Sequence, residues 1–103
     1  MYYVYILLSL KSHIFYYGST NDLRTRVEQH NQGKSFATKP HIPWELVWYA
    51  GFLTKKESED FELYLKSGAG KAFAYKRLVS VALAKDIPKR LEKKYSIAKA
   101  KGT

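Results

Sequence analysis

Short runs of aromatic and β-branched residues constrain most strongly how this chain can fold. Three such runs, at 2–9, 14–17 and 44–50, are too short and too apolar for surface helices, so each predicts a strand. A polar turn separates the first two runs and predicts a hairpin, whose second strand is expected to end at Gly18. The chain is therefore expected to contain a sheet that begins with a hairpin.

The segments that follow the hairpin carry helix signals. Ser19-Thr20-Asn21 offers N-cap oxygens to a helix over 22–32, and Gly33 is placed to end it. The next stretch, 34–43, contains two prolines and is expected to be a loop that leads into the third strand.

The second half of the chain begins with a capping box. In this motif the Thr54 hydroxyl accepts from a backbone amide while the Glu57 side chain reaches back to the cap, which predicts a helix over 55–66. A shorter helix over 71–84 and a strongly basic helix over 88–100 are expected after it. Up to residue 84 the order β-β-α-β-α-α predicts the α+β class, with an antiparallel sheet covered by helices.

Length and composition restrict the class of protein further. A chain of 103 residues fits one domain, and its 46% hydrophobic content favours a folded chain. The absence of cysteine excludes disulfides, thiolate nucleophiles and cysteine-bound zinc, and makes the cytoplasm the simplest expected compartment. No apolar run is long enough to span a bilayer and no signal segment opens the chain, so no membrane partner is expected.

Positive charge is concentrated near the end of the chain. Residues 1–69 hold eight Lys or Arg against seven Asp or Glu, whereas residues 70–103 hold ten against two. This segregation favours a polyanion partner, nucleic acid before membrane surfaces or acidic proteins; the alternative is a solvated, lysine-rich helical tail. The residues expected to contact nucleic acid are Arg24, Lys66, Lys71, Lys76, Arg77, Lys89, Arg90, Lys93 and Lys94.

Two polar side chains on the first predicted helix are candidates for chemistry. Arg26 flanks the apolar stripe of Leu23 and Val27, where a guanidinium can bind phosphate bidentately; alternatively it covers apolar surface and pairs with an acid. His30 lies nearer the middle of that stripe and could position a water molecule, although a hydrogen-bonded core histidine is the more common arrangement.

An acid and two tyrosines complete the set. Glu62 lies at the edge of its helix's packing face, where a hard oxygen suits Mg²⁺ or, alternatively, pairs with Lys66 four residues on. Tyr5 and Tyr16 fall on adjacent strands, and whether they share a face depends on a register that the sequence leaves open. As an alternative they are simply cross-strand neighbours.

The order of these motifs resembles a known family. Tyr3-Val4-Tyr5, then Tyr16-Tyr17-Gly18, then Arg26 and His30-Asn31 resemble the GIY-YIG nuclease superfamily. Its members include homing and restriction endonucleases, the excision-repair incision nuclease and small stand-alone bacterial proteins. The stretch 61–68 is similar to the stand-alone subgroup, and the whole resemblance covers residues 1–79.

The resemblance implies a fold, a chemistry and a set of roles. The fold is a three-stranded antiparallel sheet flanked by helices, and the activity is endonucleolytic hydrolysis with Mg²⁺ or Mn²⁺. By position in the motifs, the implied catalytic residues are Tyr5, Tyr16, Arg26 on the scissile phosphate, His30, and Glu62 on the metal ion.

The sequence also departs from the family pattern. Tyr3 replaces the glycine and Tyr17 the isoleucine of the family name. Ala74 stands near the place where some members have an asparagine, so no role of that asparagine transfers. No DNA-recognition domain is appended, which argues against strong sequence specificity.

These observations favour an endonuclease over two alternatives. The expected arrangement is a nuclease-like domain over 1–80 and a basic helical extension over 81–103. The expected substrate is nucleic acid, DNA before RNA, with a place in DNA repair, and the expected assembly is a monomer or homodimer. The alternatives are a non-catalytic basic nucleic-acid-binding protein and a protein-interaction module.

Overall fold

The structure, a computed structural model, describes residues 1–79. Its elements in chain order are β1 (Tyr2–Ser9), β2 (Phe15–Thr20), α1 (Leu23–Asn31), the 3₁₀ turn η1 (Lys39–His41), β3 (Trp44–Phe52), α2 (Lys55–Lys66), α3 (Gly68–Phe73) and the π-helical turn η2 (Ala74–Val79). The α+β class and the three-stranded antiparallel sheet with flanking helices are therefore confirmed.

The sheet has the strand order β2-β1-β3, and both pairings are antiparallel. Tyr5 on the central strand lies opposite Gly18 of β2 and opposite Tyr49 of β3. Leu7 lies opposite Tyr16, so Tyr16 points to the same face as Tyr5, because directly paired residues share a face and alternate residues repeat it. The register that the sequence left open thus puts both tyrosines on one side.

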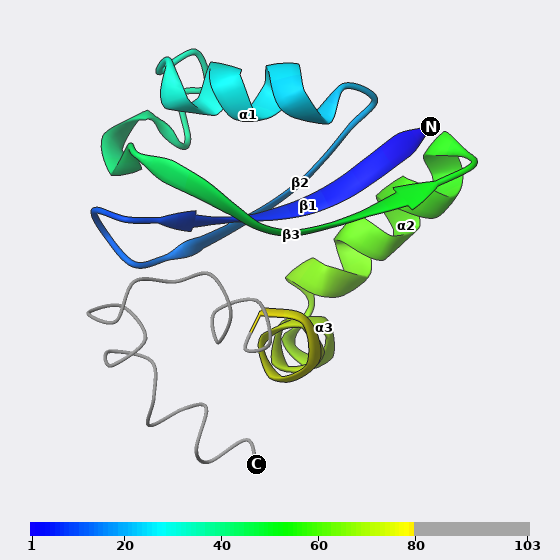
Figure 1. Cartoon of the computed structure of the whole chain (residues 1–103). Helices are drawn as coiled ribbons and strands as arrows, with labels where there is room; N and C mark the ends of the chain where they lie inside the picture. Colours follow the sequence, from blue (N-terminus) through cyan, green and yellow to red (C-terminus); the bar gives the residue numbers. More distant parts are fainter. Residues whose placement is uncertain (80–103) are drawn as a thin grey trace.

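Helices cover both faces of the sheet. Figure 1 shows α1 on one side, and α2 and α3 on the other. The central strand β1 is therefore enclosed on both faces, which explains why its sequence is almost continuously apolar instead of alternating. The buried core is Tyr5, Leu7 and Trp44 on the side of α1, and Val4, Ile6, Leu8, Leu65 and Ala74 on the side of α2.

The prediction that Gly18 ends the second strand is wrong. β2 continues to Thr20, and Gly18 is a buried, paired residue inside it. A Cβ at this position would lie 2.5 Å from the Tyr5 hydroxyl oxygen and 2.6 Å from the carbon that carries it. Glycine is needed here because the Tyr5 phenol crosses the backbone of β2, and not because the chain turns.

The N-cap prediction for the first helix is also wrong. Asp22 caps α1, with its Oδ1 accepting from the Thr25 amide at 3.2 Å. Thr20 acts one step earlier, since its hydroxyl accepts from the Asp22 amide at 3.1 Å and shapes the turn out of β2. At the other end Gly33 has a positive φ of 78°, as expected of a glycine just beyond a helix.

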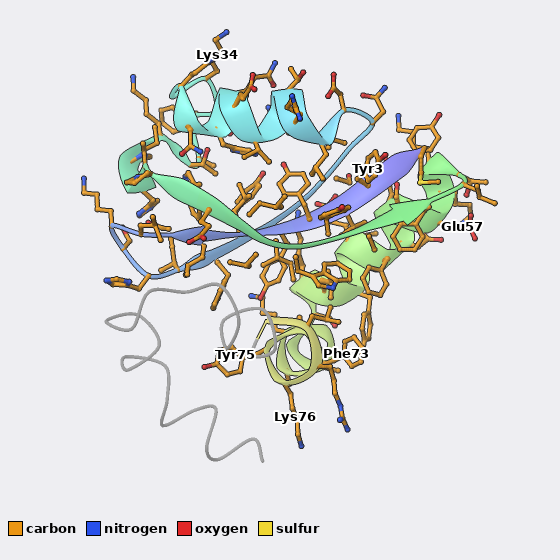
Figure 2. The ribbon with its side chains drawn as sticks, viewed as in Figure 1. Tyr3, Lys34, Glu57, Phe73, Tyr75 and Lys76 are labelled. Carbon is orange, nitrogen blue, oxygen red and sulfur yellow. The ribbon has the colours of Figure 1, made fainter. Side chains whose placement is uncertain are left out.

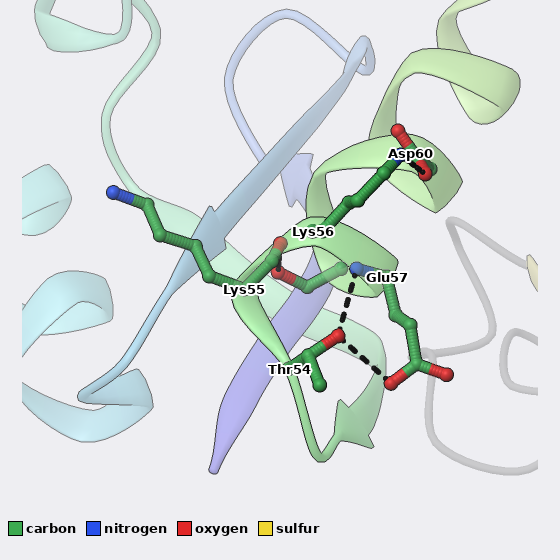
Figure 3. A network of polar contacts seen from close by, with 6 residues as sticks. Thr54, Lys55, Lys56, Glu57 and Asp60 are labelled. Atoms are coloured by element: carbon green, nitrogen blue, oxygen red, sulfur yellow. Dashed lines mark hydrogen bonds and ion pairs between the residues drawn. The ribbon is translucent and has the colours of Figure 1, made fainter.

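The capping box of the second helix forms as predicted. The Thr54 hydroxyl accepts from the Glu57 amide at 3.1 Å and donates to Glu57 Oε1 at 2.9 Å (Figure 3). The observed α2 covers the predicted range, and its start was predictable because the capping box depends only on residues close together in the sequence.

The third helix starts earlier than predicted. α3 begins at Gly68 because the Ser67 hydroxyl accepts from the Gly70 amide at 3.1 Å and caps it. The helix expected over 88–100 lies outside the described residues. Among residues 1–79 no helix is long and apolar enough to cross a membrane.

Candidate active site

Three aromatic side chains meet beneath α1. Tyr5 comes from the centre of β1, Tyr16 from β2, and His30 from the last turn of α1. The Tyr5 hydroxyl lies 2.8 Å from His30 Nε2, and both side chains are buried. The Tyr16 ring centroid lies 5.0 Å from that of His30 and 6.4 Å from that of Tyr5. The structure thus brings together three of the five predicted catalytic residues in direct contact.

The other ring nitrogen of His30 is held by a residue that sequence reasoning missed. His30 Nδ1 lies 2.7 Å from the hydroxyl of Thr38, which is itself fully buried. Trp44 Nε1 donates to the Thr38 carbonyl at 2.8 Å and holds that loop against the sheet. Because the contact joins a helix to a loop with no local pattern of its own, no signal in the sequence could have found Thr38.

A second polar clamp orients the end of α1. The Asn31 side chain accepts from the Trp44 amide at 2.7 Å and donates to the Trp44 carbonyl at 3.0 Å. The clamp ties the last residue of α1 to the first residue of β3. This helps to fix the position of His30, the residue immediately before Asn31.

Burial keeps Tyr5 and His30 uncharged. It raises the pKa of Tyr5 to about 12; the Arg26 side chain opposes this through a hydrogen bond and its positive charge, and the negative charge of Glu62 acts in the same direction as burial. Burial also lowers the pKa of His30 to about 4, assisted by the positive charge of Arg26. Near neutral pH the pair is therefore a neutral phenol beside a neutral imidazole.

Arg26 stands one helical turn before His30 and is partly buried. Its Nη1 donates to Gln29 Oε1 at 3.2 Å, so within residues 1–79 this guanidinium pairs with an amide and not with the acid that the alternative predicted. A guanidinium carries five N–H donors, so this one bond leaves room for bidentate contact with a phosphate. Its charge acts on both Tyr5 and His30, which places the guanidinium close to them.

Glu62 approaches from the other side of the sheet. It belongs to α2, and its Oε2 pairs with Lys66 Nζ at 2.6 Å, so the alternative predicted for this acid is the arrangement in the structure. The Glu62 side chain is 17% exposed and that of Lys66 48% exposed. Glu62 makes no hydrogen bond to the aromatic cluster within residues 1–79, and it acts on Tyr5 only through its charge.

The available ligands fit a hydrated hard cation. No group of three or more His, Cys, Asp or Glu within residues 1–79 could enclose a metal ion, which does not suit zinc. Both ring nitrogens of His30 are engaged, so Glu62 is the candidate ligand of the predicted set. Mg²⁺ and similar ions are commonly held by one or two carboxylates, water and substrate phosphate, and a single partly exposed glutamate meets that requirement.

The predicted nucleic-acid contacts within residues 1–79 are all exposed. Arg24 lies on α1, Lys66 on α2, Lys71 on α3, and Lys76 and Arg77 on η2. Figure 2 shows Lys76 pointing away from the sheet. The remaining four, Lys89, Arg90, Lys93 and Lys94, lie outside the described residues.

A hollow of about 610 Å³ opens between the start of α1 and the sheet. Tyr3 and Tyr49 line it. Tyr3 lies two residues before Tyr5 on β1, and Tyr49 is paired with Tyr5 on β3. None of the five predicted catalytic residues lines this hollow.

A comparison of the sequence with models of protein families identifies the family of this chain. The model of the GIY-YIG catalytic domain matches residues 1–76. The chain therefore belongs to the GIY-YIG family, a superfamily of nucleases that generally use a divalent metal ion.

Curated relatives are small bacterial proteins. The chain is 40% identical over 63 residues to UPF0213 protein YazA of Bacillus subtilis, covering 60% of this chain and 64% of YazA. It is 35% identical over 65 residues to a UPF0213 protein of Streptococcus pneumoniae, covering 62% of this chain and 65% of that protein. The matches thus span slightly less than two thirds of each of these two relatives. No solved structure matches the chain.

Proposed function

We propose that this protein is an endonuclease that hydrolyses phosphodiester bonds in nucleic acid, with DNA as its substrate, Mg²⁺ or Mn²⁺ as its cofactor, and little sequence specificity. One observation supports this most: four side chains from three elements, α1, β2 and α2, act on the same buried phenol. They are His30 by a hydrogen bond, Tyr16 by ring contact, Arg26 by a side-chain hydrogen bond and its charge, and Glu62 by charge.

Two charged residues would bind the scissile phosphate. Arg26 would contact its non-bridging oxygens bidentately and would remain charged throughout the reaction. Glu62 would hold the metal ion after giving up its pairing with Lys66, a partly exposed ion pair of the kind worth about 0.3–0.5 kcal/mol. When bound, such an ion supplies positive charge that offsets the charge developing on the phosphate.

The aromatic cluster would orient the attacking water. Tyr5 is the favoured contact, because its oxygen keeps an acceptor lone pair beside its hydrogen bond with His30. Because burial raises the pKa of Tyr5 and lowers that of His30, full proton transfer from Tyr5 to His30 is unfavourable. His30 would therefore act as a hydrogen-bond acceptor, and Tyr16, which is half-buried, remains the second candidate for the base.

Basic residues would supply affinity for the polymer. The exposed cations of α1, α3 and η2 would contact the phosphate backbone, together with those of the proposed basic extension, residues 81–103. Such contacts release counterions and carry no sequence information, which agrees with low specificity.

A non-catalytic nucleic-acid-binding protein is the second candidate function. It is favoured by the position of Glu62, which lies on the helix of the opposite face and is paired with Lys66. If that pair persisted with nucleic acid bound, the cluster around Tyr5 would be only a packed core.

Plasmid nicking separates these functions. The wild type, Glu62→Gln, and the matched control Glu59→Gln, an exposed acid on the same helix, are compared with Mg²⁺ and with EDTA. We expect Mg²⁺-dependent nicking that Glu59→Gln retains and that Glu62→Gln reduces by roughly a hundredfold or more, because a metal ligand contributes several kcal/mol. Equal inertness of all three proteins, with DNA binding intact by filter binding, would establish the binder instead.

A further inference from the structure

A continuous line of buried polar contacts runs from the sheet into the loop after α1. It passes from the Tyr5 hydroxyl to His30 Nε2 at 2.8 Å, and from His30 Nδ1 to Thr38 Oγ1 at 2.7 Å. From there the Thr38 hydroxyl reaches the Ser35 carbonyl at 3.4 Å. The side chains of Tyr5, His30 and Thr38 are all fully or almost fully buried, so water does not compete for these groups.

The supply of protons determines the direction of these bonds. Tyr5 and Thr38 each have one hydroxyl proton, and the neutral His30 ring has one N–H. If the ring proton is on Nδ1, Tyr5 donates to Nε2, Nδ1 donates to Thr38, and Thr38 donates to the Ser35 carbonyl. Every donor then has an acceptor.

The opposite tautomer satisfies fewer groups. With the proton on Nε2, His30 would donate to Tyr5, and Thr38 would donate to Nδ1. The Tyr5 hydroxyl proton would then lose its acceptor, since His30 Nε2 is the acceptor that the part of the chain described here offers it. A buried unsatisfied donor costs about 1–3 kcal/mol, which favours the first arrangement.

We propose that Thr38 is a positioning residue whose hydroxyl accepts from His30 Nδ1–H, fixes this tautomer, and so makes Tyr5 a donor to His30 whose oxygen keeps its lone pairs as acceptors. The direction of these hydrogen bonds decides whether the Tyr5 hydroxyl presents lone pairs or its proton to its surroundings. Reversed, Tyr5 would accept from His30 and direct its own proton outward. The effect of this arrangement on catalysis rests on the proposed nuclease function; the part concerning the tautomer does not.

The loop holds Thr38 in place for this role. Its carbonyl accepts from Trp44 Nε1 at 2.8 Å, and its amide donates to the Ser35 carbonyl at 3.2 Å. The backbone of Thr38 is thus fixed at both ends, independently of its side chain. Removing the hydroxyl should therefore change the tautomer of His30 more than the path of the loop.

The test is long-range ¹H–¹⁵N NMR of the histidine side chains in the intact, ¹⁵N-labelled protein, which reports directly which ring nitrogen carries the proton. Wild type is compared with Thr38→Val, Thr38→Ala and Thr38→Ser, and His30→Gln assigns the His30 signals. His41 is an internal control for the ring, because its Nδ1 lies 2.6 Å from the Ser12 hydroxyl. Its backbone amide donates to the Thr38 carbonyl at 3.1 Å, a contact that does not involve the Thr38 side chain.

We expect the Nδ1–H tautomer in wild type and Thr38→Ser, a shift toward Nε2–H in Thr38→Val and Thr38→Ala, and no change at His41. An Nε2–H tautomer in the wild type would overturn the proposal, and this result does not depend on any variant folding. An unchanged tautomer in folded Thr38→Val or Thr38→Ala would overturn it as well.

Kinetics then test the functional half of the proposal. We expect Thr38→Val to lower kcat by about tenfold with little change in KM, and Thr38→Ser to restore kcat, as one lost hydrogen bond predicts. A rise in KM with kcat unchanged would argue against a positioning role for Thr38. If the wild type does not cleave nucleic acid, the proposed function fails while the NMR result still decides the tautomer.

Discussion

Gly18→Ala should strongly destabilise the protein, although the substitution adds a single methyl group. The new Cβ would lie 2.5 Å from the Tyr5 hydroxyl oxygen and 3.1 Å from Tyr16 Cε2. Tyr5 cannot yield cheaply, because it is buried and its hydroxyl lies 2.8 Å from His30 Nε2.

The expected cost combines three effects. Overpacking a core costs about 1–3 kcal/mol, and leaving buried His30 without its partner adds about 1–3 kcal/mol. Alanine restricts the unfolded chain, which returns about 0.4–1 kcal/mol. The free energy of unfolding should therefore fall by roughly 2–5 kcal/mol, and Tm by roughly 10–30 °C for a domain of this size.

Urea and thermal unfolding measure this change, with Gly51→Ala as the matched control. Gly51 also lies in a strand, β3, but a Cβ there would meet the exposed, flexible Met1 side chain. That variant should stay within about 0.5 kcal/mol of wild type. Equal stability of the two variants, with the Tyr5 ring resonances of Gly18→Ala unmoved, would refute the argument that Gly18 makes space for the phenol.

Three further outcomes follow from particular contacts. Because burial lowers the pKa of His30 from 6.5 to about 4, the unfolded state binds a proton before the folded state does as the pH falls. The contribution of His30 to the free energy of unfolding should therefore be full above about pH 6.5 and lower by about 3 kcal/mol at pH 4. Urea unfolding measured across this pH range should show the decrease in wild type and not in His30→Gln. Thr54→Ala should cost about 1 kcal/mol in urea unfolding by removing the α2 cap, whereas Thr54→Ser should cost little. DNA binding should weaken steeply with salt in filter binding, and a flat dependence would favour the protein-interaction module.

Features that depend on neighbouring residues were predictable from the sequence. The apolar run of β1 and the Thr54 capping box each contain their own signal, and both elements formed with the expected bounds. The GIY-YIG resemblance identified the family because it depends on the order of motifs and not on their contacts.

Features that depend on distant contacts were not predictable. Gly18 was interpreted as a strand end because glycine usually signals a turn, but here its role is set by the Tyr5 ring of the neighbouring strand β1. Thr38 acquires its role from His30 and Trp44, and the loop around it carries no pattern. The side of the sheet from which Glu62 approaches depends on how α2 packs, which residue spacing alone does not fix.

The central claim is that Glu62 and the cluster around Tyr5 serve one metal-assisted site, although Glu62 comes from α2 on one face of the sheet and the cluster packs against α1 on the other face. Paramagnetic broadening by Mn²⁺ in NMR spectra of the intact protein tests it most directly. We expect Mn²⁺ to broaden the side-chain signals of Glu62, Tyr5, Tyr16 and Arg26 together, and Glu62→Gln to abolish the effect. Broadening confined to the exposed acids Glu57 and Asp60, or unchanged in Glu62→Gln, would contradict the claim.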